Sequence, residues 1–387
     1  MRSVYFRDEH EQFRLEVRRF VEEQVAPHVD AWEAEGRIPR EIFRRLGALG
    51  FLGITAPEEW GGSGGDIFFA MAFLEELPRS MSGGFCAAVS VQQFMATPHI
   101  LRYGSEALRR EFVVPSIAGH KVGALAITEA DTGSDVASIR TAAAREGDSY
   151  VIHGEKTFIT NGADGDFYTL AVRIGDAPGA AGLSLLVVDR ATPGVTVAKR
   201  LDKLGWHASD TAEIRFDNVR VPAERLIGRE GAGFAMLVES FALERIVAAA
   251  IAVGSAAVAL ETARGYMSAR RAFGRTLDTF QALRHRLADL DAELEAARQL
   301  TYHAAWLHEQ GEPAGRESAM AKLVATELGQ RIADACVQVY GGYGFMEELP
   351  AARMFRDARG ATISAGTSEI MREIIARALF DTKGEGR

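Results

Sequence analysis

The sequence predicts a multidomain α+β protein with an all-α N-terminal domain, a central β-barrel or β-sandwich domain and a C-terminal four-helix-bundle domain. Three observations predict it. Apolar residues recur every three or four positions up to about residue 120, short runs rich in β-branched and aromatic residues follow, and long alanine- and leucine-rich runs return after Gly231. We therefore place the domains at residues 1–121, 122–228 and 229–387.

The N-terminal domain is predicted from helical periodicity. The apolar residues that share its first helix face are Phe13, Val17, Phe20, Val21 and Val25. Residues 38–49 and 67–77 repeat the pattern, and the glycine-rich residues 61–65 form a loop between them. Because apolar stripes of this kind are more often hydrophobic core than ligand site, we assign them to the core.

The central domain is predicted from strand-like runs bounded by turn signals at residues 146–148 and 192–194. The runs are residues 150–153, 167–172, 183–188 and 214–216. Because no helical patterns lie between these runs, a doubly wound dinucleotide-binding fold is not expected.

The C-terminal domain is predicted from long helical runs with almost no internal proline, at residues 234–267, 281–310 and 317–339. Long helices joined by short connections are typical of a bundle, which also offers apolar surface for contacts between subunits.

Composition excludes several classes of function. The 44 basic and 53 acidic side chains give a net charge of −9, which argues against nucleic acid or an anionic membrane as a partner. Cys86 and Cys336 lie far apart with no second thiol or histidine at metal spacing, so we expect neither a disulfide framework nor a metal site. Residues 1–8 lack a signal pattern, and no apolar run approaches the ~18 residues of a membrane span. We therefore expect a cytoplasmic protein.

Two segments near the start of the central domain have the composition of a cofactor site. Residues 128–135, Thr-Glu-Ala-Asp-Thr-Gly-Ser-Asp, form a small-residue loop whose hydroxyls and main-chain amides can approach a flat polar ring or a phosphate. In residues 156–162, Phe158 and Thr160 are two positions apart, so they point to the same side of a strand and can cover and hydrogen-bond the edge of a ring. Taken alone, each segment is also typical of an ordinary polar loop or a half-buried strand.

Two later segments suit a pyrophosphate and a close approach of the backbone. Residues 270–274, Arg-Arg-Ala-Phe-Gly, precede Phe280 and Gln281, and a guanidinium presents paired donors to paired phosphate oxygens. Residues 338–344, Gln-Val-Tyr-Gly-Gly-Tyr-Gly, place glycines directly after a helical run. Taken alone, a helix arginine is more often solvated, and glycine is the ordinary end of a helix.

Together with the C-terminal run, these segments resemble the acyl-CoA dehydrogenase family. Residues 356–359, Arg-Asp-Ala-Arg, and 363–370, Ile-Ser-Ala-Gly-Thr-Ser-Glu-Ile, resemble the flavin-contacting end of that family, and the other segments follow its order over nearly the whole chain. Ala130, Thr132 and Phe158 depart from the proline, alanine and tryptophan usual there. The resemblance implies FAD as cofactor, an acyl-CoA substrate and a homo-oligomer, commonly a dimer of dimers.

The resemblance also assigns site residues. Those expected near the flavin are Leu125, Ile127, Thr128, Gly133, Ser134, Phe158, Ile159, Thr160, Thr367, Ser368 and Glu369. Those expected at the adenosine-diphosphate part of a flavin bound by a neighbouring subunit are Arg270, Phe273, Gln281, Gln338, Gly341 and Gly342. Those expected to contact the substrate are Ser134, Arg245 and Gly366.

The base that starts the reaction is missing from its usual place. In most branches of the family a glutamate precedes the Gly-Thr of the C-terminal run, whereas this chain has Ala365. In the isovaleryl-CoA and long-chain branches, a Leu-Glu-Arg helix position supplies the base instead, and residues 243–245 match it. The resemblance therefore makes Glu244 the base and leaves Ala365 a backbone N–H that bonds the thioester carbonyl together with a flavin ribityl hydroxyl.

The surroundings of Glu244 suit that role. Its helix neighbours three and four positions away are Ser240, Phe241, Val247 and Ala248, none of which is a cation that could pair with it. A carboxylate among apolar residues has a raised pKa, which a base needs when the proton is only weakly acidic. On spacing alone, a salt bridge to a distant residue or exposure to solvent stays open.

We therefore expect FAD-dependent dehydrogenation of an acyl-CoA to the trans-2-enoyl-CoA, with electrons passing to an electron-transfer flavoprotein. The small residues Ser364 and Ala365 leave room beside the reacting carbons, which favours a long or branched acyl group, as in fatty acid β-oxidation or branched-chain catabolism. Two other hypotheses remain: an oxygen-using acyl-CoA oxidase or flavin monooxygenase of the same fold, and a non-catalytic protein that binds acyl-CoA or FAD.

Overall fold

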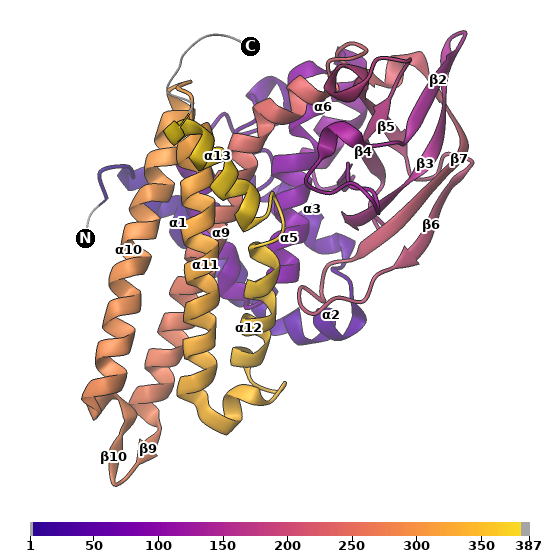
Figure 1. Cartoon of the computed structure of the whole chain (residues 1–387). Helices are drawn as coiled ribbons and strands as arrows, with labels where there is room; N and C mark the ends of the chain where they lie inside the picture. The colour runs from indigo at the N-terminus through magenta and orange to yellow at the C-terminus, as the bar shows by residue number, and fades with distance from the viewer. Residues whose placement is uncertain (1–2, 381–387) are drawn as a thin grey trace.

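The chain folds as helices, then strands, then helices again (Figure 1). The structure, a computed structural model, describes residues 3–380. The change from helix to strand falls between Ile117 and Gly123, and the change back falls between Ile227 and Gly233. The predicted fold class is thereby confirmed, while the three domain bounds stay a prediction.

The N-terminal region is a set of helices built around α4 and α5, whose side chains are apolar on nearly every side and buried. Asp66 and Ser82 cap these two helices by accepting hydrogen bonds from the first-turn N–H groups of Phe68 and Phe85. The helices of this region are α1 (Asp8–Phe20), α2 (Val29–Glu35), α3 (Arg40–Ala48), α4 (Ile67–Glu76), α5 (Gly83–Val91), α6 (Pro98–Tyr103), α7 (Glu106–Leu108) and α8 (Val114–Ile117).

The central region is a mainly antiparallel sheet in the strand order β6-β7-β3-β2-β4-β5-β8, with β1 pairing parallel to β4. Its strands are β1 (Gly123–Ala126), β2 (Ala142–Glu146), β3 (Ser149–Thr160), β4 (Phe167–Arg173), β5 (Leu183–Asp189), β6 (Val195–Arg200), β7 (Thr211–Pro222) and β8 (Leu226–Ile227). Strands β4 and β5 are buried on both faces, because one face packs inside the sheet region and the other packs on helices through residues such as Phe167 and Leu185.

The C-terminal region is a helical bundle (Figure 1). Its elements are α9 (Gly233–Ala269), the hairpin strands β9 (Arg271–Ala272) and β10 (Arg275–Thr276), α10 (Gln281–Glu309), α11 (Gly315–Tyr340), α12 (Pro350–Ala361) and α13 (Ser368–Phe380). The long helices α9, α10 and α11 lie side by side, and α12 and α13 pack along α11. The β9–β10 hairpin forms the tip of the bundle that is farthest from the sheet.

Helix α9 is more apolar than the sequence pattern alone suggested. It contains an 18-residue window of mean hydropathy 1.9, which by length and composition is enough to cross a membrane. Of that window, 67% is buried inside the fold, where α9 packs against α4, α10, α11 and α12. The apolarity of α9 is therefore that of a helix in the middle of a core.

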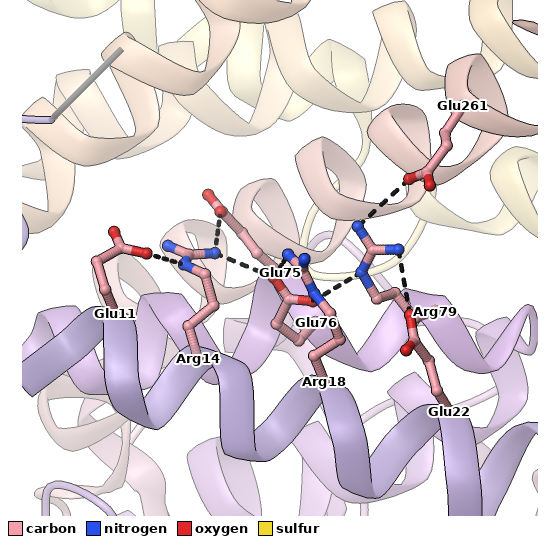
Figure 2. Close-up of polar contacts among 8 residues, drawn as sticks. All are labelled: Glu11, Arg14, Arg18, Glu22, Glu75, Glu76, Arg79 and Glu261. Carbon is pink, nitrogen blue, oxygen red and sulfur yellow. Dashed lines mark hydrogen bonds and ion pairs between the residues drawn. The ribbon is translucent and has the colours of Figure 1, made fainter.

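A network of ion pairs joins α1, α4 and α9 (Figure 2). At its centre Glu76, only 3% exposed, accepts hydrogen bonds from Arg18 at 2.9 and 3.0 Å and from Arg79 at 2.8 Å. Arg14 donates to the neighbouring Glu75 at 2.8 Å, and Arg79 also reaches Glu261 on α9. The network thus ties the first helix to the bundle with paired charges in a place where unpaired charges would be costly.

Candidate active site

A mostly apolar cavity lies between α5, α9, α11 and α12 and extends to Thr160 of the sheet. With its open mouth it encloses about 1150 Å³. One wall is the row of residues on α9 that recur every three or four positions, namely Val247, Ala248, Ile251, Ala252, Ser255, Val258 and Ala259. Thr160 of β3 and the loop residues Ser364 and Ala365 line the end nearest the sheet. The cavity therefore joins the helix expected to carry the base to the loop expected to carry the backbone donor.

Glu244 lies one helical turn before Val247 and Ala248, and so on the helix face that leads into the cavity. Its side chain is buried, with 6% exposure. Burial raises the pKa of Glu244 to about 7, while a hydrogen bond from Ser240 and the charge of Arg245 act in the opposite direction. No ion pair to Glu244 is present among residues 3–380, so the distant salt bridge left open by the sequence is absent from the described chain.

The hydroxyl of Ser240 donates to Oε1 of Glu244 at 2.9 Å, and the oxygen of that hydroxyl lies 3.3 Å from Nε2 of His99 on α6. Glu244 itself does not line the cavity wall; its carboxylate is held one turn back toward the start of α9. The helical spacing predicts Ser240 as a neighbour of Glu244, whereas His99 precedes Ser240 by 141 residues and could not be predicted from the sequence.

Ala365 has the backbone geometry of a residue whose N–H is presented to a ligand. Its φ of 51° is in the left-handed region that L-residues rarely adopt, and Gly366 follows with φ 91°. Within the described part of the chain, the Ala365 N–H donates to no other residue. The fully buried Lys322 of α11 donates to the Gly366 carbonyl oxygen at 2.6 Å, and burial lowers the pKa of this lysine to about 8. Lys322 therefore helps hold the loop in its strained shape, and sequence reasoning missed it.

The loop after β1 is tied to β3. Lys156, buried completely, donates to the Ile127 carbonyl oxygen and to Glu129, both at 2.8 Å, and the Thr157 N–H donates to the Thr128 carbonyl oxygen at 2.9 Å. Of the predicted contacts in this loop, Leu125, Ile127 and Thr128 are half-buried, while Gly133 and Ser134 are exposed. A Cβ at Gly133 would meet nothing within 4 Å, so the loop end is open to a ligand.

The strand alternation expected at Phe158 is interrupted. Strand β3 has a β-bulge between Lys156 and Ile159, and Phe158 takes φ 59°. Phe158 is consequently 67% exposed, whereas the side chain of Ile159 packs in the core of the sheet region. The prediction that regular strand alternation places Phe158 and Thr160 on one face was therefore based on an alternation that the bulge interrupts. Because the Ile159 side chain is in the core, only the backbone of Ile159 is available to a ligand.

The remaining predicted cofactor residues form a separate group at the tip of the bundle. Arg270, Phe273 and Gln281 flank the β9–β10 hairpin and are exposed, Phe273 by 95%. Gln338, Gly341 and Gly342 are exposed too and lie beside them, since Arg270 stacks over the Tyr343 ring at 5.9 Å. Figure 1 places this tip far from the sheet, so the structure brings the predicted residues together as two groups and does not join them in one site.

Residues at the start of α13 lie next to the Ala365 loop. Thr367 is half-buried and accepts from the Ile370 N–H, Ser368 is buried, and Glu369 is exposed. Arg245 is half-buried, with its guanidinium 5.7 Å from the centre of the Phe241 ring. Asp357, which the sequence noted only as part of a motif, lines the cavity and accepts from the N–H groups of Gly83 and Trp206; burial raises its pKa to about 6.

The residues beside the sheet fit a flat, partly polar ring. The ring of Phe158 is an exposed apolar surface, and Thr160 lines the cavity. The Thr132 hydroxyl is buried without a partner in the described chain. At the bundle tip, the exposed Arg270 and the glycines after α11 fit a phosphate-bearing group. Both groups thus fit the two ends of a flavin dinucleotide.

Comparison with known proteins points to one family. Family models of the acyl-CoA dehydrogenase N-terminal, middle and C-terminal domains match residues 7–120, 124–219 and 231–380. The mitochondrial long-chain specific acyl-CoA dehydrogenase of Sus scrofa is 38% identical over 380 residues, which is 98% of this chain and 88% of that protein.

Solved structures agree with these matches. The structure of a probable acyl-CoA dehydrogenase from Mycobacterium abscessus superposes with a TM-score of 0.95 at 41% identity, over 97% of this chain and 100% of that one. A glutaryl-CoA dehydrogenase from Mycobacterium smegmatis, solved in complex with FADH2, gives a TM-score of 0.92 at 29% identity, over 99% and 97% of the two chains.

Proposed function

This chain belongs to the acyl-CoA dehydrogenase family, and we propose that it oxidises a long-chain acyl-CoA between the α and β carbons, with Glu244 as the base. The observation that carries the proposal is the state of Glu244, a buried carboxylate that no cation of residues 3–380 pairs with, one turn from an acyl-sized cavity. Burying an unpaired carboxylate costs free energy, and carboxylates whose pKa is shifted by burial are found preferentially at catalytic sites.

The chain's own residues divide the work at the thioester. Glu244 takes the α-proton, for which a pKa near 7 is well matched to neutral pH. The Ala365 N–H donates to the thioester carbonyl oxygen, where negative charge develops as the proton leaves. Lys322 keeps that donor in place through the Gly366 carbonyl. Arg245 and Ser134 bind other parts of the substrate.

The cofactor is FAD, as in the family. When bound, it supplies the acceptor for the hydride that leaves the β carbon. Thr128, Ser134 and Thr160 would hold the ring with hydroxyl and backbone groups, and Phe158 would cover it. Thr367, Ser368 and Glu369 would bind beside it from α13.

The shape of the cavity supports a long acyl chain rather than a branched one. Ala248 and Ala259 are eleven residues apart on α9, so the lined stretch is about 16 Å long at about 1.5 Å per residue. An extended chain advances roughly 1.2 Å per bond, which corresponds to about thirteen bonds. The residues of α5 that line this space are small, namely Cys86, Ala87 and Ser90, and Pro78 and Met81 line it too.

The second group of cofactor residues leads us to propose a homotetramer built as a dimer of dimers. The β9–β10 hairpin, in and beside which Arg270, Phe273 and Gln281 lie, is at the end of the bundle away from the sheet (Figure 1), so we assign these residues to a flavin held at the sheet of a neighbouring subunit. Phe273, at 95% exposure, is also the kind of apolar residue that a neighbouring subunit covers. We further propose an electron-transfer flavoprotein as the electron acceptor.

The test is anaerobic titration of the purified yellow protein with straight-chain and branched acyl-CoAs. Bleaching that is fastest with acyl chains of about twelve or more carbons is expected. Bleaching only with a branched short chain would overturn the chain length. No bleaching with any acyl-CoA would overturn the dehydrogenase and favour a binding protein, and steady hydrogen peroxide release in air would favour an oxidase.

The channel itself is tested by filling it. Ser255→Phe is expected to slow bleaching by long chains at least tenfold while shorter chains still react, because the new ring shortens the cavity by about one turn of α9. Equal loss with all chain lengths would show that Ser255 does not lie along the acyl path. Ser318→Ala, a buried serine on α11 outside the cavity, is the control.

A further inference from the structure

The base is the end of a hydrogen-bond chain that begins on another helix. His99 on α6 lies 3.3 Å from the Ser240 hydroxyl oxygen, and that hydroxyl lies 2.9 Å from Oε1 of Glu244. All three residues are at least half-buried, with His99 1% and Glu244 6% exposed. A side chain from a distant region of the sequence therefore reaches the carboxylate of Glu244 through the Ser240 hydroxyl.

The protons along this chain can be placed. Burial lowers the pKa of His99 to about 4, so its ring is neutral at pH 7 and has one N–H. A serine hydroxyl has one proton, which an ionised Glu244 requires because it can only accept. Since the Ser240 proton goes to Glu244, the 3.3 Å contact between Nε2 of His99 and the Ser240 oxygen is a hydrogen bond only if His99 donates from Nε2.

The donation from His99 matters because Ser240 has a competing acceptor. Its hydroxyl also lies 3.0 Å from the Leu237 carbonyl oxygen, the usual local acceptor for a serine inside a helix. An incoming N–H occupies one lone pair of the hydroxyl oxygen and limits the directions the O–H can take. His99 therefore favours the rotamer that donates to Glu244 over the one that donates to Leu237.

We propose that His99 is a positioning residue for the base: through Ser240 it holds Oε1 of Glu244, so that Oε2 is aimed at the substrate. The proposal rests on Glu244 being the base. It gives the enzyme a way to keep a buried carboxylate in one orientation without a cation, which would remove its basicity.

The other charged and titratable groups around Glu244 do not replace this chain. On α9 itself the adjacent group is Arg245, whose charge favours the ionised form of Glu244. From α11, Lys322 lies near Arg245 and is bonded to the Gly366 carbonyl oxygen. From α6, Arg102 and Tyr103 bond Glu239 at the surface. The segment 92–96, which packs on α9, brings no titratable side chain.

The test compares Ser240→Ala, His99→Leu and His99→Gln as FAD-loaded enzyme. The bleaching rate with a long-chain acyl-CoA is measured from pH 5 to 10, and the infrared band of the protonated Glu244 carboxyl, assigned by its absence in Glu244→Gln, is titrated without substrate. Loss of the hydrogen bond is expected to move both midpoints up by about one pH unit in Ser240→Ala, and by less in His99→Leu. His99→Gln, which keeps an N–H donor, is expected to keep both midpoints close to their wild-type values.

In Ser240→Ala and His99→Leu the bleaching rate should therefore fall near neutral pH, where more of Glu244 is protonated, and recover at high pH, where Glu244 is ionised. Unmoved midpoints in Ser240→Ala would overturn the proposal, as would a shift in Ser240→Ala with none in His99→Leu. Ser318→Ala is the matched control, because its hydroxyl also donates to the carbonyl three residues earlier in a helix. Full activity of Glu244→Gln would instead overturn the base assignment on which the proposal rests.

Discussion

Two buried glutamates in this protein have pKa values shifted in opposite directions. Glu76, 3% exposed, is surrounded by the guanidinium groups of Arg14, Arg18 and Arg79 (Figure 2). Burial acts to raise its pKa, but the bonds and charges of these arginines hold the pKa below its ordinary value. Glu244, 6% exposed, is bonded within the described chain by the hydroxyl of Ser240 alone, and its pKa rises to about 7.

The difference teaches how to tell a structural carboxylate from a reactive one. Burial is similar at both, so burial alone does not identify a base. The partner decides: a cation fixes the charge and joins helices, whereas a neutral hydroxyl leaves the proton equilibrium near neutral pH.

The largest expected effect separates the two residues by chemistry. Glu244→Gln is expected to slow anaerobic bleaching by a long-chain acyl-CoA on the order of 10³-fold, because a positioned general base contributes that much. Glu76→Gln should leave the rate within about threefold, since Glu76 lies outside the cavity. Stopped-flow absorbance of the flavin measures both. Comparable slowing in the two variants would break the distinction.

Stability is expected to show the reverse order. Glu76→Gln leaves the half-buried Arg18 without its carboxylate and removes one partner each from Arg14 and Arg79, so it should lower the free energy of unfolding by about 3 kcal/mol at pH 7. Denaturant unfolding of the FAD-loaded protein is the measurement, with Glu244→Gln as the matched variant. A larger loss in Glu244→Gln than in Glu76→Gln would contradict the comparison.

The pH dependence should have opposite signs. The pKa of Glu244 is raised from 4.5 to about 7 on folding, so wild-type stability relative to Glu244→Gln should fall as pH rises through that window, by up to about 3 kcal/mol. The pKa of Glu76 is lowered from 4.5, so the deficit of Glu76→Gln is present above pH 4.5 and should shrink below it. Unfolding curves at pH 4, 6 and 8 test both signs, and parallel curves would refute them.

The smallest effect is expected at an exposed pair. Glu106 and Arg110 form an ion pair within one turn, and both side chains are 68% exposed. Glu106→Gln should change the free energy of unfolding by no more than about 0.5 kcal/mol, because water screens the pair. A loss as large as that of Glu76→Gln would mean that burial is not what distinguishes the two ion pairs.

The sequence predicted the fold class because it depends on local patterns, and it singled out Glu244 through the resemblance of residues 243–245 to a family motif. Periodicity identified the helices and strands, and the absence of a cation near Glu244 on its own helix could be read directly. It could not predict Lys322 bonding Gly366, or His99 reaching Ser240, because these contacts join segments 44 and 141 residues apart. Phe158 was misjudged for another reason: a β-bulge inserts one residue and breaks the alternation on which the prediction rested.

The continuity of α9 sets a relation between reaction and substrate. The same unbroken helix carries Glu244 and the cavity-lining residues as far as Ala259. The length of cavity beyond the base therefore depends on the number of helical turns between these two residues. One turn is about 5.4 Å, or roughly four carbon–carbon bonds. Inserting or removing a full turn of α9 between Glu244 and Ala259 would therefore change the longest acyl chain that the cavity accepts by about four carbons, and the base would stay in place.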